Sequence, residues 1–145
     1  MPATEAQATA TFRRPVRDLI RRPPVTCPPS TSIAEAARLM QAHGVGSVVV
    51  IAQGEEPVGI VTDRDLRGKV VATGLSPAQP VARIMSSPLH TLPPDAPAIE
   101  ALVSMLRLGI HHLPVVESAP PGHEAGTLPG ALGPGRRLVG VVSSN

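Results

Sequence analysis

The sequence predicts a mixed α+β fold made of two tandem copies of one βαββα unit, and an internal repeat is the first observation behind this prediction. A shift of 65 residues places Pro15 on Pro80 and Gly44 on Gly109. The same shift aligns Thr26 with Thr91, Pro28–Pro29 with Pro93–Pro94, Glu35–Ala36 with Glu100–Ala101, Met40 with Met105 and Val50 with Val115. A repeat of this length indicates a duplicated supersecondary unit. The second observation is that both copies carry the same succession of helix and strand signals.

The repeat also predicts how the chain is divided. Its register breaks late in the second copy, because Gly59 corresponds to Gly140, a shift of 81 residues. The additional residues fall in 118–135, a stretch rich in proline and glycine that is typical of a flexible surface loop. We therefore expect a flexible tail at 1–14, a first repeat at 15–75, and a second repeat at 80–145 that contains this insertion.

The first copy contains six predicted elements. They are a short amphipathic start at Val16–Ile20, an extended piece at Val25–Cys27, a helix from Ser32 to Gly44, strands at Val48–Ile51 and Val58–Thr62, and a helix from Asp63 to Ala72. Ser32 and Glu35 have capping-box spacing, and glycine at position 44 suits a left-handed helix stop. The wholly apolar strand at Val48–Ile51 is typical of a strand covered on both faces.

The second copy repeats this order. It has a start at Val81–Met85, an extended piece at Leu89–Leu92, a helix opened by Asp95 and Pro97 and closed by Gly109, and strands at Leu113–Val116 and Leu138–Ser143. We expect Ile99, Leu102, Val103 and Leu106 to form the inward face of its helix. The second repeat lacks its last helix, since the sequence ends at Asn145 where that helix should begin, so we expect more protein downstream.

Composition excludes several classes of protein. The chain has one Phe, no Tyr and no Trp, which argues against proteins that stack bases on aromatic rings. A single cysteine, Cys27, excludes an internal disulfide and a multi-cysteine metal site. The longest apolar run is too short to span a bilayer, and the N-terminus shows no secretory signal. We expect a soluble, cytoplasmic protein.

A cluster of arginines near the N-terminus raises a nucleic-acid alternative. Its members are Arg13, Arg14, Arg17, Arg21 and Arg22. A basic arm has this composition, but so does a solvated entry segment. The formal net charge is only +2, and no aromatic residues are interleaved, so we expect no nucleic-acid partner.

Thr62 and Asp65 are the candidate ligand-binding residues of the first copy. Thr62 ends a strand and opens a helix, where free backbone N–H groups and the helix dipole favour an anion. The Asp65 carboxylate lies one turn later and suits the paired hydroxyls of a ribose. The alternative is structural: Thr62 caps the helix, and Asp65 is a solvated acid of its first turn.

No catalytic constellation is recognisable. The sequence shows no nucleophile–histidine–acid arrangement in a strand–turn–helix context and no P-loop. His111 and His112 are adjacent on a strand entry, so their side chains point to opposite faces and do not form a metal pair. We expect no enzyme activity, no metal and no cofactor.

The repeat resembles a cystathionine-β-synthase (CBS) domain pair, also called a Bateman module. The residues that carry the resemblance are Pro15–Ile20, Gly59–Leu66, Gly109–Val116 and Gly140–Ser143. Val61–Arg67 and the Gly-Ile-His-His-Leu-Pro-Val stretch are also similar to CBS pairs of larger bacterial proteins, in which a cyclic-nucleotide-binding-like domain precedes the pair and a nucleotidyltransferase-like domain follows it.

The resemblance implies a regulatory module that binds AMP, ADP, ATP or S-adenosylmethionine in the cleft between the repeats. It assigns Gly59, Thr62 and Asp65 to the pattern Gly-x-x-Thr/Ser-x-x-Asp, and His111 and His112 to the ligand phosphates. The alternative for each histidine is a surface residue or a satisfied core residue. Ser143 matches Thr62, whereas the counterpart of Asp65 would lie beyond the last residue. Val25, Thr26 and Cys27 complete the expected ligand-binding set.

The resemblance also implies assembly. CBS pairs typically stack in twos into a flat disk, so we expect a homodimer and a neighbouring domain in the parent protein. Leu66, Val70 and Val71 of the helix after Thr62 are the apolar residues that we expect to contribute to the dimer. The alternative function is a structural dimerisation module that binds no nucleotide.

Overall fold

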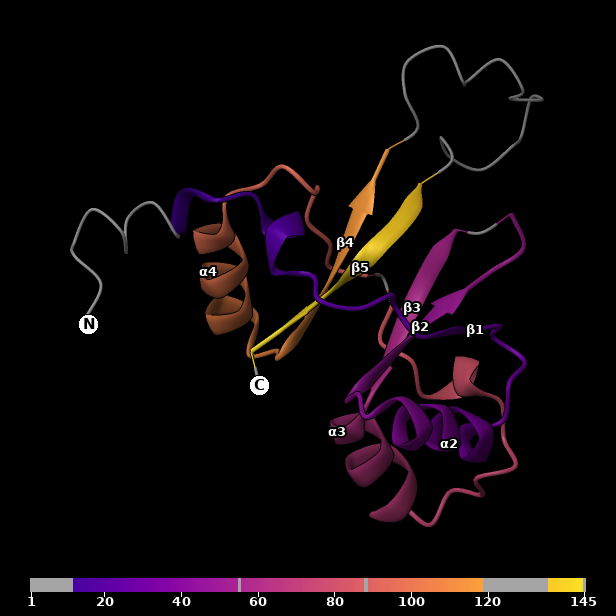
Figure 1. Ribbon diagram of the computed structural model, residues 1–145. Coiled ribbons are helices and arrows are strands. Elements are labelled where there is room, and N and C mark those ends of the chain that lie inside the picture. Colours follow the sequence, from indigo (N-terminus) through magenta and orange to yellow (C-terminus); the bar gives the residue numbers. More distant parts are fainter. Residues whose placement is uncertain (1–11, 55, 88, 119–135, 145) are drawn as a thin grey trace. The chain divides into compact units, whose positions relative to one another are not determined.

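The computed structural model describes residues 12–54, 56–87, 89–118 and 136–144. In chain order the elements are η1 (Val16–Leu19), β1 (Thr26–Cys27), α2 (Ile33–His43), β2 (Ser47–Ile51), β3 (Pro57–Thr62), α3 (Asp63–Asp65), η2 (Leu66–Val71), η3 (Val81–Arg83), α4 (Ala98–Leu108), β4 (His112–Glu117) and β5 (Arg137–Ser143) (Figure 1). The mixed α+β class is confirmed. The order of elements agrees as well, except that the extended piece expected at Leu89–Leu92 is reduced to an isolated bridge between Leu92 and Val115. The predicted insertion lies outside the described residues except for Ser118, and so does most of the predicted tail.

The described chain forms two compact units. The central unit consists mainly of residues 24–87, and the terminal unit combines residues 12–23, 90–117 and 139–144. The opening segment of each sequence repeat therefore belongs to the unit that holds the body of the other repeat. The compact units and the sequence repeats do not coincide.

Backbone hydrogen bonds hold these exchanged segments in equivalent positions. In the terminal unit, the Val16 amide donates to the Ala96 carbonyl over 2.7 Å. In the central unit, the Val81 amide donates to the Thr31 carbonyl over 2.8 Å. Val16 and Val81 correspond under the 65-residue shift, as do Ala96 and Thr31, and both valines are fully buried.

In each unit, a glycine of the last strand packs against the exchanged segment. A Cβ on Gly59 would lie 2.6 Å from the sulfur of Met85, and a Cβ on Gly140 would lie 2.6 Å from Cγ2 of Ile20. Met85 and Ile20 occupy equivalent repeat positions, at the end of each exchanged segment. Each glycine therefore leaves the space that the side chain of an exchanged segment fills.

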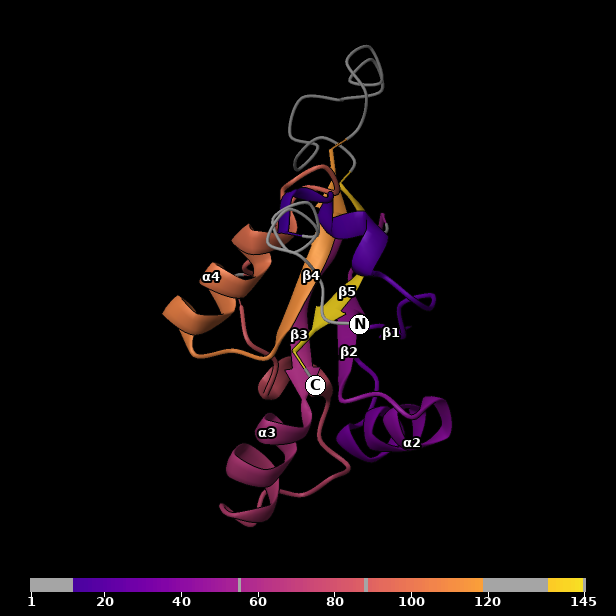
Figure 2. The same ribbon diagram turned by 60° about the vertical axis from the view of Figure 1, so that its left-hand side comes forward.

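The central unit is built on a three-stranded sheet in the order β1-β2-β3. β1 runs parallel to β2, and β2 runs antiparallel to β3. α2, α3 and η2 lie beside this sheet (Figures 1 and 2). The core consists of Cys27, Ile33, Ala36, Met40, Val48, Val50, Val61, Val70, Val81 and Ile84. The cap by Ser32 and the stop at Gly44 are confirmed: the Glu35 amide donates to the Ser32 hydroxyl over 3.1 Å, and Gly44 ends α2 at φ 63°. The Glu35 carboxylate forms an ion pair with Arg38 at 3.2 Å.

The terminal unit pairs β4 with β5 and packs α4 over a smaller core. The predicted inward face of α4 is wrong. Ala98, Ala101 and Met105 are buried. The four residues expected inside are all exposed: Ile99 (37%), Leu102 (43%), Val103 (43%) and Leu106 (75%). Two of the three buried residues of α4, Ala98 and Ala101, are small, and the larger apolar residues of the helix project outward.

The helix after Thr62 also differs from expectation. Val70 is buried in the core of the central unit, and Leu66 packs against that core. Only Val71 is exposed, at 78%. Leu66 and Val70 therefore stabilise their own unit, and the exposed apolar surface lies on α4 instead.

Candidate functional site

Thr62 and Asp65 meet where β3 passes into α3. The Asp65 amide donates to the Thr62 hydroxyl oxygen over 3.3 Å, and the Thr62 amide donates to Asp65 Oδ2 over 2.9 Å. These reciprocal bonds form a capping box with aspartate at the third helical position. The Thr62 hydroxyl also donates to Asp65 Oδ2 over 3.2 Å. The helix cap expected of Thr62 is confirmed.

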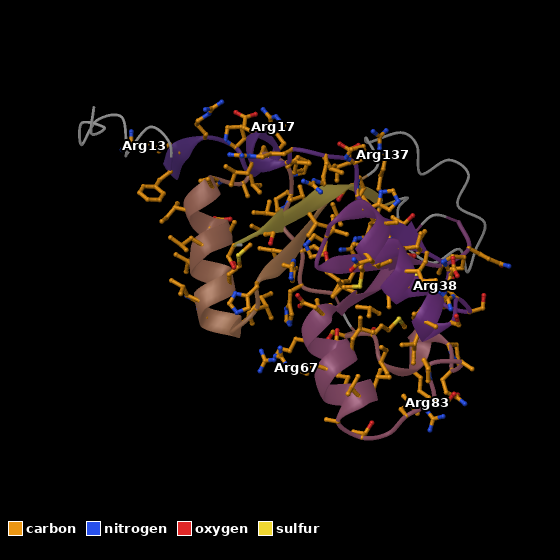
Figure 3. All side chains as sticks on the ribbon, turned by 60° about the horizontal axis from the view of Figure 1, so that its bottom comes forward. Arg13, Arg17, Arg38, Arg67, Arg83 and Arg137 are labelled. Carbon is orange, nitrogen blue, oxygen red and sulfur yellow. The ribbon has the colours of Figure 1, made fainter. Side chains whose placement is uncertain are left out.

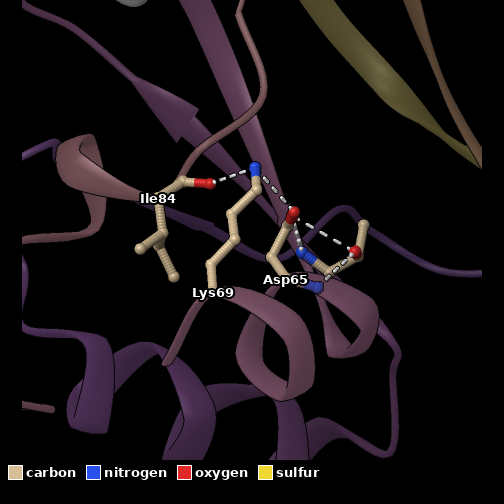
Figure 4. A network of polar contacts seen from close by, with 4 residues as sticks. Asp65, Lys69 and Ile84 are labelled. Atoms are coloured by element: carbon tan, nitrogen blue, oxygen red, sulfur yellow. Dashed lines mark hydrogen bonds and ion pairs between the residues drawn. The ribbon is translucent and has the colours of Figure 1, made fainter. Parts of the chain in front are cut away.

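Asp65 is not the solvated acid of the structural alternative. The residue is 7% exposed, and its second oxygen, Oδ1, lies 3.0 Å from Lys69 Nζ. Lys69 Nζ also donates to the carbonyl oxygen of Ile84 over 2.9 Å (Figure 4). The carboxylate is therefore held by an amide, a hydroxyl and an ammonium group, all from the central unit.

Sequence reasoning missed this role of Lys69. A signal was present, because Asp65 and Lys69 are four residues apart on a predicted helix, and such pairs face each other. No comparable signal pointed to Ile84, which lies on the segment that follows η3. The Lys69 side chain is 47% exposed and that of Asp65 is 10% exposed, so the pair joins the interior of the unit to its surface.

Val25, Thr26 and Cys27 lie along β1. Thr26 is exposed, whereas Cys27 points the other way into the core of the central unit. The Val25 carbonyl accepts a hydrogen bond from the Val49 amide over 2.9 Å. Burial raises the pKa of the Cys27 thiol, and a side-chain hydrogen bond with Thr31 partly opposes this. Cys27 is therefore a packed, protonated thiol at neutral pH.

His111, His112 and Ser143 belong to the terminal unit. His112 opens β4 and is buried, whereas His111 is exposed, as the prediction of opposite faces requires. His111 Nδ1 lies 2.9 Å from the Ser144 hydroxyl, and the Ser144 amide donates to the His111 carbonyl over 3.0 Å. Ser143 ends β5 and is exposed.

The contact of His111 with Ser144 repeats a contact of the first copy. There the Asp63 amide donates to the Gly46 carbonyl over 3.1 Å. Gly46 corresponds to His111 under the 65-residue shift, and Asp63 corresponds to Ser144 under the later shift of 81. Aligning the two copies would have predicted this contact.

Metal-ligating side chains do not gather in groups of three among the described residues: these contain no group of three or more His, Cys, Asp or Glu residues that could hold a metal ion. None of the described helices is long and apolar enough to cross a membrane.

Two arginines of the N-terminal cluster have contacts within the terminal unit. Arg14 forms an ion pair with Asp18 at 3.2 Å, and Arg17 Nη1 donates to the Pro94 carbonyl over 3.5 Å. In the central unit, Arg38, Arg67 and Arg83 project from three different elements (Figure 3).

Comparison with known proteins places these features in context. Residues 16–72 and 81–130 match the family model of the CBS domain. An uncharacterized protein of Methanopyrus kandleri is 42% identical over 103 residues, which cover 70% of this chain and 53% of that relative. The chain thus spans about half the length of this relative.

Two solved structures share the fold over most of the chain. A CBS domain protein of Pyrobaculum aerophilum, complexed with AMP, is 30% identical with a TM-score of 0.72, covering 89% of this chain and 86% of that one. The CBS domain pair of protein MJ0100, in complex with 5′-methylthioadenosine and S-adenosyl-L-methionine, is 26% identical with a TM-score of 0.73. That match covers 90% of this chain and 89% of the other.

Proposed function

Because the chain belongs to the CBS domain family, we propose that it is a regulatory module that binds an adenosine-containing ligand and modulates an attached or partner protein. The ligand class is AMP, ADP, ATP or S-adenosylmethionine. Support comes from the two similar structures, one complexed with AMP and the other with 5′-methylthioadenosine and S-adenosyl-L-methionine. The role is regulatory rather than catalytic, and its location is cytoplasmic.

The fixed carboxylate of Asp65 is the observation that carries this proposal. A buried carboxylate held by several donors has a set orientation, and its remaining acceptor capacity is directional. Ribose hydroxyls are donors that such a group can accept. Thr62 positions the carboxylate through the capping box, and Thr26, on β1 of the same unit, is an exposed polar residue that we include in the site.

The terminal unit contributes the remaining proposed residues. The exposed His111 imidazole is suited to a phosphate group, and Ser143 occupies the position that Thr62 holds in the first copy. The buried His112, together with Val25 and Cys27, completes the proposed set.

Thermal unfolding in the presence of AMP, ADP, ATP or S-adenosylmethionine tests the proposal. A ligand that binds only the folded state raises stability by about 2.7 kcal/mol at a hundredfold excess over its Kd. We expect at least one of the four to raise the melting temperature, and Asp65→Asn to diminish that shift more than the control Glu35→Gln, an acid of α2 in the same unit. No shift with any of the four contradicts the proposal.

The exposed apolar face of α4 favours a second role, homodimerisation. Ile99, Leu102, Val103 and Leu106 lie on this face. In the first copy the equivalent residues are Ala34, Ala37, Arg38 and Gln41, which are smaller or polar. Because only the second copy carries large apolar side chains here, we propose that this face packs against a second copy of the chain. A neighbouring domain of the parent protein is the alternative occupant.

A further inference from the structure

We propose that Lys69, together with Asp65, recognises two adjacent hydroxyl groups of the ligand and thereby selects ribose over deoxyribose. This inference rests on the proposed function, because it concerns the ligand bound at Asp65. It adds a specificity-determining residue that the family pattern Gly-x-x-Thr/Ser-x-x-Asp does not contain.

The hydrogen-bonding capacity of Asp65 is the first step of the argument. Oδ2 already accepts from the Thr62 amide (2.9 Å) and the Thr62 hydroxyl (3.2 Å). A carboxylate oxygen accepts about two hydrogen bonds, so Oδ2 has no capacity left. Oδ1 contacts only Lys69 Nζ among the described residues, at 3.0 Å. One acceptor position on Oδ1 therefore remains for a ligand.

Lys69 supplies the complementary group. An ammonium group has three N–H donors. Asp65 Oδ1 takes one and the Ile84 carbonyl takes another, at 2.9 Å, and in the described part of the chain Nζ has no third partner (Figure 4). Two anchors fix the position of the ammonium group, while the side chain remains 47% exposed. One donor on Nζ is therefore available beside the free acceptor on Oδ1.

A vicinal diol matches this donor–acceptor pair. Oδ1 and Nζ are one hydrogen-bond length apart, similar to the separation of two hydroxyl oxygens on neighbouring ribose carbons. One hydroxyl donates to Oδ1 and its neighbour accepts from Nζ. A single hydroxyl satisfies only one of the two groups. A site built to bond a hydroxyl discriminates against an analogue that lacks it, because its own polar group is left unpaired.

Calorimetric titration with AMP, 2′-deoxy-AMP and 3′-deoxy-AMP tests this inference. We expect the wild type to bind AMP about tenfold or more tightly than either deoxy analogue, from the loss of one hydrogen bond to a charged group. Lys69→Met should weaken the binding of AMP about tenfold. The affinity of this variant for AMP should then equal its affinity for the analogue that lacks the hydroxyl facing Lys69. Lys69→Arg, which keeps a charged donor, should retain a preference for AMP.

Arg67→Met is the matched control, since it removes another exposed cation from the same helical segment. Arg67→Met changes only the overall charge near the site, so any change in affinity should be the same for all three nucleotides. Equal weakening of all three by Lys69→Met, or no weakening of any, overturns the role of Lys69.

Binding to the wild type alone can also overturn the role of Lys69, whether or not Lys69→Met folds. Binding of AMP and both analogues with equal affinity overturns the role of Lys69 and leaves the proposed function standing. No binding of AMP overturns the role of Lys69 in binding AMP, and no binding of any of the four proposed ligands overturns the proposed function as well.

Discussion

Asp65 combines a structural and a binding role in one side chain. Its carboxylate completes a capping box with Thr62 and forms an ion pair with Lys69, while the residue is 7% exposed. A buried carboxylate is costly unless its partners satisfy it, and removing it leaves those partners unpaired. A substitution of Asp65 therefore changes stability as well as affinity, and the two effects have to be measured separately.

Asp65→Ala should lower the free energy of unfolding by about 1–3 kcal/mol, because the cap is lost and the Thr62 amide loses its acceptor. Asp65→Asn keeps an acceptor oxygen of the same shape and should cost less. Urea unfolding of both variants without ligand measures this difference. An unfolding free energy for Asp65→Ala equal to that of the wild type would show that the network does not stabilise the unit.

The raised pKa of Cys27 predicts slow chemistry and a loss of stability in alkali. Burial keeps the thiol protonated in the folded state, so the unfolded chain ionises at lower pH than the folded one. The stabilising contribution is therefore complete below the pKa of the unfolded thiol and is lost as pH rises through the folded pKa. Alkylation by iodoacetamide at pH 8 should be slow in the native protein and fast in urea. Equal rates would indicate an accessible thiolate.

At the scale of elements, the two copies use the same geometry with different side chains. Gly59 faces Met85 and Gly140 faces Ile20, each within 3 Å of a hypothetical Cβ. Methionine is flexible and can move away from an added methyl group, whereas isoleucine is branched at Cβ and stiff. The equivalent glycines should therefore tolerate substitution to different degrees.

Gly140→Ala should destabilise the protein by about 1–3 kcal/mol through overpacking, and Gly59→Ala should cost less. Thermal unfolding of the two variants side by side compares them under one condition. A larger loss for Gly59→Ala would show that Met85 has no room to move.

The exposed face of α4 predicts an effect on assembly without an effect on folding. Val103→Arg with Leu106→Gln copies the residues that α2 carries at these positions, Arg38 and Gln41. Surface substitutions of this kind change stability by about 0.5 kcal/mol or less. Sedimentation velocity should show weaker self-association for the double variant, while Arg107→Gln, a neighbouring exposed position, should behave as the wild type does. Unchanged association would leave the face to another partner.

The sequence predicted most elements because each carried a local signal. Ser32 and Gly44 bounded α2 correctly, and the apolar run at β2 was a buried strand. The inward face of α4 was missed because Ala98 and Ala101 are small, and a count of large apolar residues ignores them. Their first-copy equivalents, Ile33 and Ala36, are buried, so the repeat register contained the answer.

Two features could not be predicted from local patterns. The bond from Lys69 to the Ile84 carbonyl joins positions 15 apart, and no periodicity specifies such a pair. The exchange of opening segments could not be predicted either. The apolar pattern of Val16–Ile20 indicates that this segment packs against a core, but it does not indicate which of the two cores.

At the scale of the whole molecule, each core depends on a segment from outside its own repeat. Val81 and Ile84 belong to the core of the central unit, and Val16 belongs to that of the terminal unit. A chain cut at the repeat boundaries therefore loses core residues, whereas one cut at the unit boundaries keeps them.

Residues 24–89 expressed alone should thus fold better than residues 15–75, although the two fragments are of similar length. The first retains Val81 and Ile84, and the second lacks both and carries an unmatched Val16. Amide dispersion in two-dimensional NMR and cooperativity of urea unfolding distinguish them. Both fragments are near the lower size limit for an independent domain, where the loss of two core residues has a large effect on folding. A better-folded 15–75 would contradict the division into units.

The exchanged segments also determine when each unit can fold during synthesis. All core residues of the central unit have been synthesised once residue 89 has left the ribosome. The terminal unit needs both its opening segment, Val16–Ile20, and its last strand, β5, in which Gly140 packs against Ile20. Because synthesis proceeds at roughly 5–20 residues per second, the apolar side chains of the opening segment remain uncovered for several seconds before β5 is made. Contacts so far apart in sequence also close slowly. The N-terminal segment, although made first, is therefore among the last to be buried.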